Sequence, residues 1–230
     1  MKLTGALLFC GYTKTTRALI NEMKHNVNFS QLTVVSHNCP DTHLSESGIK
    51  SICGDFCDPH VLSGILEQNT GYSAVIIFSE YQPGIDSQTV DMRTAIAAAA
   101  IRKRLKDAYI IVEIINSANT ALITHLKCDE IIFRDKIDSD FIINSLLYPH
   151  SMQIFSGLFS QSSEVIYMLS VESLDIAFPA VWKNVLRSCF EEGHTCIGYT
   201  VPGKPPSLGL CPDDIVPGHA HILCVKPATG

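Results

Sequence analysis

ALLFCGYTKTT, residues 6–16, is the stretch that decides the fold. It begins with five consecutive apolar residues, Ala6–Cys10, which is typical of a β-strand buried on both faces. Gly11 follows directly, and residues 15–25 carry apolar side chains at helical spacing. The stretch therefore predicts a buried strand, a tight turn at glycine and a helix.

The same alternation of short apolar runs and helix-like segments continues to residue 138. Further strands are predicted at residues 31–36, 49–53, 74–78, 109–114 and 130–133, and helices after Asp58-Pro59 and at residues 86–105 and 119–126. Strands that alternate with helices form a parallel sheet covered on both faces. The sequence thus predicts a Rossmann-like, doubly wound α/β domain over residues 1–138, with ligands at the carboxyl ends of its strands.

A long apolar segment, residues 139–160, follows this domain and is interrupted at Tyr148-Pro149. Proline breaks a helix, so we expect a pair of helices joined by a turn. Because apolar residues lie nearly all round the segment, we expect it to pack on a second subunit, the alternative being packing on its own sheet. The expected dimer interface consists of Phe141, Ile142, Leu146, Leu147, Ile154 and Phe155.

The remaining residues, 161–230, predict a small α+β lobe. Strands are expected at residues 165–170, 195–200 and 219–225, a helix near 181–192, and a loop rich in proline and glycine at 201–218.

Composition excludes several classes of protein. With 230 residues, 46% of them hydrophobic, the chain can build a core and is not intrinsically disordered. The formal net charge of −6, without a basic cluster, excludes generic nucleic-acid binding. No apolar run approaches the roughly 20 residues of a membrane span, so we expect a soluble chain. The nine cysteines, an odd number, indicate free thiols in a reducing, cytoplasmic compartment.

The turn after the first strand lies where a GxGxxG dinucleotide fingerprint belongs, but keeps one glycine of three. Thr13 replaces the second glycine, so its side chain obstructs a dinucleotide, although its hydroxyl could bind a single phosphate. The second strand ends in Ser36-His37, without an acid for a ribose. Two interpretations stay open: a nucleotide-binding site, or a turn that has lost this function. The residues of the nucleotide-binding site would be Gly11, Tyr12, Thr13, Thr16, Ser36, His37 and Asp55.

Metal sites are the other candidates. Glu80 and Glu113 follow or end neighbouring predicted strands, where carboxylate oxygens would suit Ca²⁺, the alternative being two solvated acids. Cysteines and histidines between residues 37 and 60 could bind zinc, but their spacing is loose: His37, Cys39, His43, Cys53, Cys57 and His60. No P-loop, GxSxG, HExxH or Tyr-x-x-x-Lys motif is present, so we expect no enzyme.

Several of these segments, taken in order, resemble the RCK (regulator of K⁺ conductance) domain. They are LLFCGYTKTTRALI (7–20), ICGDFCDPHVL (52–62), SAVIIFSE (73–80), YIIVEI (109–114) and CDEIIFRDKI (128–137). The apolar pair of helices resembles the crossover through which two RCK domains form a homodimer, and the last residues resemble the C-terminal lobe of that family.

The resemblance implies a regulatory function at the cytoplasmic face of the cell membrane. The domain would form a gating ring, an octamer built from dimers, and would gate a potassium channel on binding Ca²⁺ or, less favoured, NAD or an adenine nucleotide. The alternative is a stand-alone, nucleotide-binding subunit of a Trk-type K⁺ uptake transporter.

Overall fold

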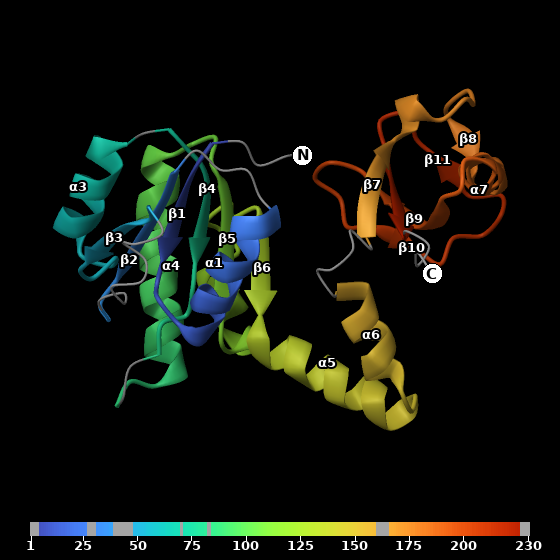
Figure 1. The fold of residues 1–230 in the computed structure, drawn as a ribbon. Coiled ribbons are helices and arrows are strands. Elements are labelled where there is room, and N and C mark those ends of the chain that lie inside the picture. The colour runs from blue at the N-terminus through green and yellow to red at the C-terminus, as the bar shows by residue number, and fades with distance from the viewer. Residues whose placement is uncertain are drawn as a thin grey trace. The chain divides into compact units, whose positions relative to one another are not determined.

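The computed structural model describes residues 5–26, 31–38, 48–69, 71–81, 84–159 and 166–225 (Figure 1). The chain divides into two compact units, Met1–Ile143 and Asn144–Gly230. The division falls inside the segment predicted as the crossover. Each unit has a hydrophobic core of its own.

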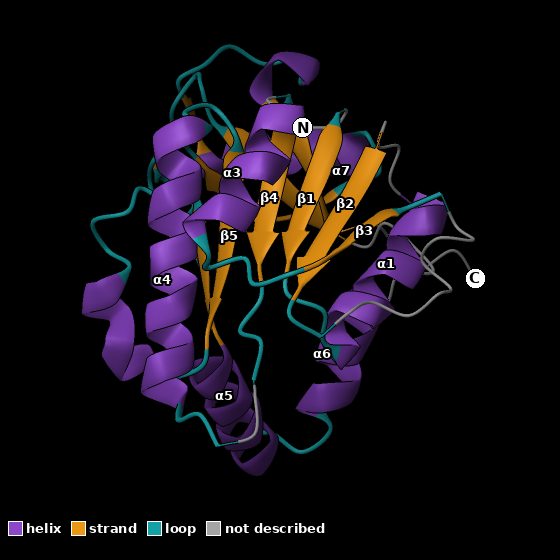
Figure 2. Ribbon diagram, turned by 90° about the vertical axis from the view of Figure 1, so that its left-hand side faces the viewer, coloured by secondary structure: helices purple, strands orange, loops and turns teal. Residues whose placement is uncertain are grey.

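The first unit is built on a six-stranded sheet in the order β3-β2-β1-β4-β5-β6, with all neighbours parallel. Figure 2 shows β5, β4, β1 and β2 of this sheet side by side. This confirms the doubly wound, Rossmann-like fold. The strands are β1 (Ala6–Cys10), β2 (Gln31–Ser36), β3 (Lys50–Cys53), β4 (Tyr72–Ile77), β5 (Tyr109–Ile114) and β6 (Glu130–Phe133).

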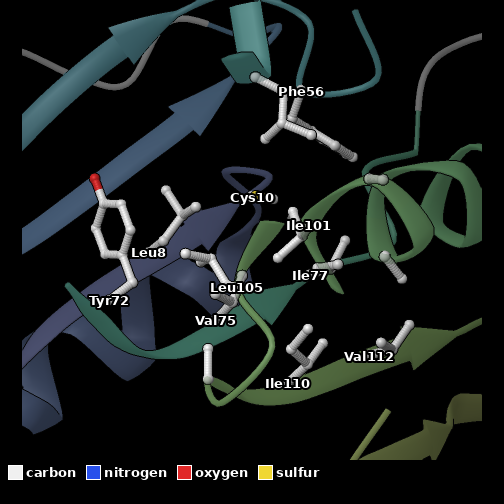
Figure 3. Close-up of a cluster of buried hydrophobic side chains, with 14 of the residues drawn as sticks. Leu8, Cys10, Phe56, Tyr72, Val75, Ile77, Ile101, Leu105, Ile110 and Val112 are labelled. Carbon is white, nitrogen blue, oxygen red and sulfur yellow. The ribbon is translucent and has the colours of Figure 1, made fainter. Parts of the chain in front are cut away.

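Alternate side chains of the buried strand β1 enter two different cores, as the two-residue period of a strand requires. Leu8 and Cys10 pack with helices α3 (Pro59–Gln68) and α4 (Ser87–Arg104) in the cluster of Figure 3. Leu7 and Phe9 pack on the opposite face with α1 (Lys14–Asn26). The parallel sheet is therefore covered on both faces.

Side-chain caps fix the beginning of two helices of the first unit. Asp58 accepts a hydrogen bond from the His60 amide at 2.8 Å, and Pro59 occupies the first helical turn of α3. Asp86 accepts from the Thr89 amide at 2.7 Å at the start of α4. The helix expected at residues 119–126 is instead a short 3₁₀ helix, η1, at Ser117–Leu122. Asn116 caps it through the Ala118 amide.

The crossover consists of α5 (Arg134–Leu147) and α6 (Ser151–Phe159). The interruption falls at residues 148–150, next to Pro149 as predicted, but α5 begins directly after β6, five residues earlier than the predicted segment. Helix α5 buries none of its residues.

The second unit holds an antiparallel sheet in the order β10-β9-β12-β7 and a two-stranded sheet, β11-β8. Helix α7 (Trp182–Glu191) contributes Trp182 and Val185 to its core. The segment expected to be only a loop contains two short strands, because residues 207–208 pair with β9 and residues 215–216 pair with β8. Its strands are β7 (Ile166–Ser170), β8 (Ala180–Val181), β9 (Thr195–Thr200), β10 (Ser207–Leu208), β11 (Ile215–Val216) and β12 (His221–Val225), with a 3₁₀ turn, η2, at Val171–Ser173.

Candidate functional site

The candidate site lies at the carboxyl ends of β1, β2 and β4. Strand β1 lies between β2 and β4, so the sheet order reverses there, and open α/β sheets bind ligands at such a switch point. Most of the residues predicted to bind a nucleotide lie at or just after the carboxyl ends of these three strands, and so does Glu80. The order of the strands therefore brings them to one edge of the sheet.

Glu80 is the centre of this edge and is only 4% exposed. The Ser36 hydroxyl donates a hydrogen bond to its Oε1. The Asn38 side-chain amide donates to Oε1 at 3.3 Å, the His37 backbone amide to Oε2 at 3.4 Å, and the Tyr12 backbone amide to Oε1 at 3.5 Å. The buried Glu80 side chain thus engages donors from the ends of both β1 and β2.

Gly11 lets the first turn pass close to the end of β4. Its φ is +99°, and a Cβ at this position would lie 3.2 Å from both the Cβ and the carbonyl oxygen of Phe78. A side chain at this position would therefore be strained by the backbone angle and crowded by Phe78. This one glycine of the fingerprint has a structural requirement behind it.

Thr13 and Thr16 form a reciprocal cap at the start of α1. The Thr16 amide donates to Thr13 Oγ1 at 3.2 Å, and the Thr13 amide donates to Thr16 Oγ1 at 3.0 Å. The Thr16 hydroxyl also donates to the Gly11 carbonyl at 3.2 Å. A phosphate at a helix N-terminus would need such backbone amides as donors, and here the two threonine hydroxyls already accept their hydrogen bonds.

Asp55 engages partners outside the Glu80 cluster. Its Oδ1 accepts from the Cys57 amide and from Arg93 Nη2 of α4, both at 2.8 Å. Burial by itself would raise the pKa of Asp55, but these hydrogen bonds and the Arg93 charge lower it below its usual value. Its bonds tie the turn before α3 to α4.

Glu113, the second expected calcium ligand, also has donors of its own. The Ser79 amide donates to its Oε2 at 2.8 Å, and Arg134 Nε lies 3.5 Å from its Oε1. Burial raises the pKa of Glu113. Calcium at Glu80 and Glu113 stays a prediction, and binding would require both carboxylates to exchange these donors for the ion.

The zinc candidates do not meet in the described part of the chain. Cys39 and His43 lie outside the described residues, and Cys53 is disulfide-bonded. The Cys57 thiol donates to the Arg93 carbonyl at 3.2 Å. Of the cysteines in the described ranges, seven are free and Cys53 is not, so Cys53 departs from the expectation of free thiols.

The predicted interface residues lie on α5 and α6, and four are largely exposed. Ile142 is 70% exposed, Leu146 80%, Leu147 62% and Ile154 66%, whereas Phe141 and Phe155 are half-buried. The dimer itself stays a prediction. Apolar exposure on this scale is what an interface helix needs.

Two groups were missed in the sequence. Asp91, fully buried in α4, accepts from the Ile115 and Asn116 amides and from Asn119, and holds the segment that follows β5. An acid beside the alanine-rich run of that helix was the available signal. Cys189, Cys196 and Cys224 form the other group, with their sulfurs within 4.8 Å of one another. Their spacing in the sequence gives no sign of it.

Comparison with known proteins identifies a domain family from the sequence and a shared fold from solved structures. The family model of the TrkA-N domain matches residues 7–134. No curated protein matches the chain. The human SLO3 gating ring has the same fold, with a TM-score of 0.73 and 16% identity over 96% of this chain. The match spans 44% of the length of the SLO3 chain.

Two further solved structures share parts of this similarity. The TrkA-N domain of the inner membrane protein ybaL from Escherichia coli matches 61% of this chain and 96% of its own, at 16% identity and a TM-score of 0.48. The GsuK RCK domain matches 97% of this chain and 44% of its own, at 11% identity and a TM-score of 0.48. Among the described residues, no helix is long and apolar enough to cross a bilayer.

Proposed function

This chain belongs to the TrkA-N domain family, and from that premise we propose that it is the regulatory domain of a potassium channel, assembling with copies of itself into a gating ring. The observation that carries the proposal is the exposed apolar surface of α5 and α6 in a chain with the fold of the SLO3 gating ring. Ring assembly through homodimers, with an octamer as the complete ring, would cover this surface at the cytoplasmic face of the membrane.

The role we propose is allosteric and not catalytic. The buried acid at the switch point, Glu80, accepts hydrogen bonds from the Ser36 hydroxyl and the His37 amide, so its oxygens are engaged by the chain itself. A regulatory domain needs only a ligand that binds two shapes of the ring with different affinity. The TrkA-N fold supplies a switch-point edge where such a ligand can act.

Glu80 determines which ligand this edge can take. In the structure its carboxylate already accepts the donors that an incoming phosphate or ribose would use, so NAD or an adenine nucleotide must first displace it. We therefore propose that the resting domain holds Glu80 inward and is insensitive to nucleotide. We also propose that Ca²⁺, or another ion that binds the Glu80 carboxylate, would draw it away from these donors.

Calorimetric titration with ADP and with NAD tests the closed edge. The wild-type chain should bind neither measurably, whereas Glu80→Ala, which frees the Tyr12 and His37 amides, should bind ADP. Glu67→Ala is the matched control, because the Glu67 side chain is 75% exposed and lies on α3. Wild-type binding that Glu80→Ala leaves unchanged would refute the closed edge.

The size and location of the native polypeptide test the channel assignment. An antibody against this domain, used on separated membrane and soluble fractions, should detect a membrane band well above 25.2 kDa, the mass of this chain. A soluble band at 25.2 kDa that co-purifies with a K⁺ transporter would overturn the channel in favour of a Trk-type regulatory subunit.

A further inference from the structure

Three cysteines from three elements of the second unit meet in its core. Cys189 lies on α7, Cys196 on β9 and Cys224 on β12, and their Sγ atoms all lie within 4.8 Å of one another. The Sγ atoms of Cys196 and Cys224 are 3.5 Å apart. Cys189 and Cys224 are fully buried, and Cys196 is half-buried.

A β-bulge creates this meeting. Strand β12 pairs Leu223 with Gly198 but Cys224 with Cys196, so Ile197 is the extra residue of β9. Without the bulge, Ile197 would lie opposite Cys224, and the Cys196 side chain would move one place along the pairing. Bulges are a common means of re-aiming a side chain, and here the result is a sulfur placed opposite a sulfur.

The spacing of the sulfurs fits one metal ion. Zinc–sulfur bonds are about 2.3 Å long, so three sulfurs around an ion with bonds of that length lie about 3.8 to 4.0 Å apart, for tetrahedral and trigonal geometry respectively. The observed separations, 3.5 Å for one pair and no more than 4.8 Å for any, are within a side-chain adjustment of this value.

The donor set selects the class of ion. Three sulfurs favour a soft, thiophilic ion such as Cu(I) or Zn²⁺, and they do not suit the oxygen-seeking Ca²⁺ or Mg²⁺. Among the described residues no histidine or carboxylate joins the three sulfurs as a fourth ligand. His194, the nearest candidate in sequence, accepts or donates a hydrogen bond at 2.6 Å with the Tyr167 hydroxyl. A set of three favours an ion that is stable with three ligands.

We propose that Cys189, Cys196 and Cys224 bind one Cu(I) ion in three-coordinate sulfur geometry. The ion reaches the site from the side of Cys196, the one partly exposed ligand, and binding releases the thiol protons. The ion would link α7 to β9 and β12 and so stabilise the second unit. This site does not depend on the ligand edge proposed at Glu80 in the first unit.

An anaerobic competition titration of the full chain tests the site. The reduced protein is titrated with Cu(I) in the presence of a chromogenic Cu(I) chelator. The wild type should take one equivalent from the chelator, develop an ultraviolet thiolate-to-copper charge-transfer band, and unfold at a higher temperature. Cys196→Ser should weaken Cu(I) binding at least about 100-fold, beyond the usual range for an outer-shell change, and abolish the thermal shift.

Two controls separate this site from the other thiols and from misfolding. Cys211→Ser removes the exposed thiol of the same unit and should bind Cu(I) as the wild type does. Cys196→Ala should leave strand β9 intact, as an unchanged circular dichroism spectrum would show, and should lose Cu(I) binding in the same way as Cys196→Ser. Wild-type affinity in Cys196→Ser, no copper taken from the chelator, or a Cys196–Cys224 disulfide that survives treatment with the reductant would each overturn the proposal.

Discussion

The replacement of Leu146 and Leu147 by aspartate should convert the assembly of this chain into monomers. Both residues lie in the last turn of α5, and both side chains are largely exposed. If two copies embrace through α5 and α6, both leucines are buried at the interface. The double variant then loses apolar burial and forces charges into the place that it occupied.

The size of this effect follows from how much of each side chain is available. Leu146 is 80% exposed and Leu147 62%. Complete burial of a leucine contributes about 1.5–3 kcal/mol, so covering these fractions on both protomers of a two-fold dimer contributes about 4–8 kcal/mol. Since 1.4 kcal/mol is a factor of ten, the dimer should weaken by roughly a thousand-fold to a million-fold.

Sedimentation velocity at micromolar concentrations measures the outcome. The wild type should sediment as a dimer or a larger ring, and the double variant as a monomer with an unchanged circular dichroism spectrum. Ile96→Asp is the control, since Ile96 is 55% exposed but lies on α4; it should leave the dimer intact. A double variant that keeps the wild-type mass would refute the interface.

Three further measurements probe single contacts. Gly11→Ala places a Cβ 3.2 Å from a neighbouring backbone at φ +99° and should cost about 2–4 kcal/mol in thermal unfolding, against about 1–2 for Gly84→Ala in open space at φ +85°; equal costs would contradict this. The lowered pKa of Asp55 means that its pairing with Arg93 stabilises the fold at neutral pH and loses this effect as pH falls below about 4. Asp55→Asn should therefore lose stability in urea at pH 7 but match the wild type in acid, and a difference independent of pH would refute the pairing. Val185→Ala, in the core of the second unit, should lower the free energy of unfolding of that unit by about 2 kcal/mol and leave that of the first unit unchanged. An equal shift of both unfolding transitions would argue against two units.

The sheet could be predicted because its strands are buried on both faces. A run such as Ala6–Cys10 leaves few alternatives, and the glycine at its end and the helix after it repeat along the chain. The break at Pro149 was equally readable, because proline cannot continue a helix. The 3₁₀ helix at Ser117–Leu122 was not, since its short turns depend on the cap from Asn116 and on bonds to Asp91.

The candidate site was predictable in place but not in chemistry. Glu80 was expected as a metal ligand because it follows a strand end, and the structure turns its carboxylate toward amides 43 and 68 residues away. Such a contact depends on the path of three turns, which local patterns do not encode. The cysteine cluster shows the same limit, because a single extra residue in β9 decides which side chain lies opposite Cys224.

The Glu80 carboxylate acts as an intramolecular ligand for the donors at the switch point, because it belongs to the same chain as those donors. Its local concentration is set by the fold and cannot be diluted, in the way that a linked module acts at a fixed effective concentration. If an anion binds at this edge as proposed, its apparent affinity is its intrinsic affinity multiplied by the fraction of molecules in which Glu80 has withdrawn. Any event that moves the segment after β4 changes that fraction without touching the anion, and a bound anion must by reciprocity hold that segment in its withdrawn position.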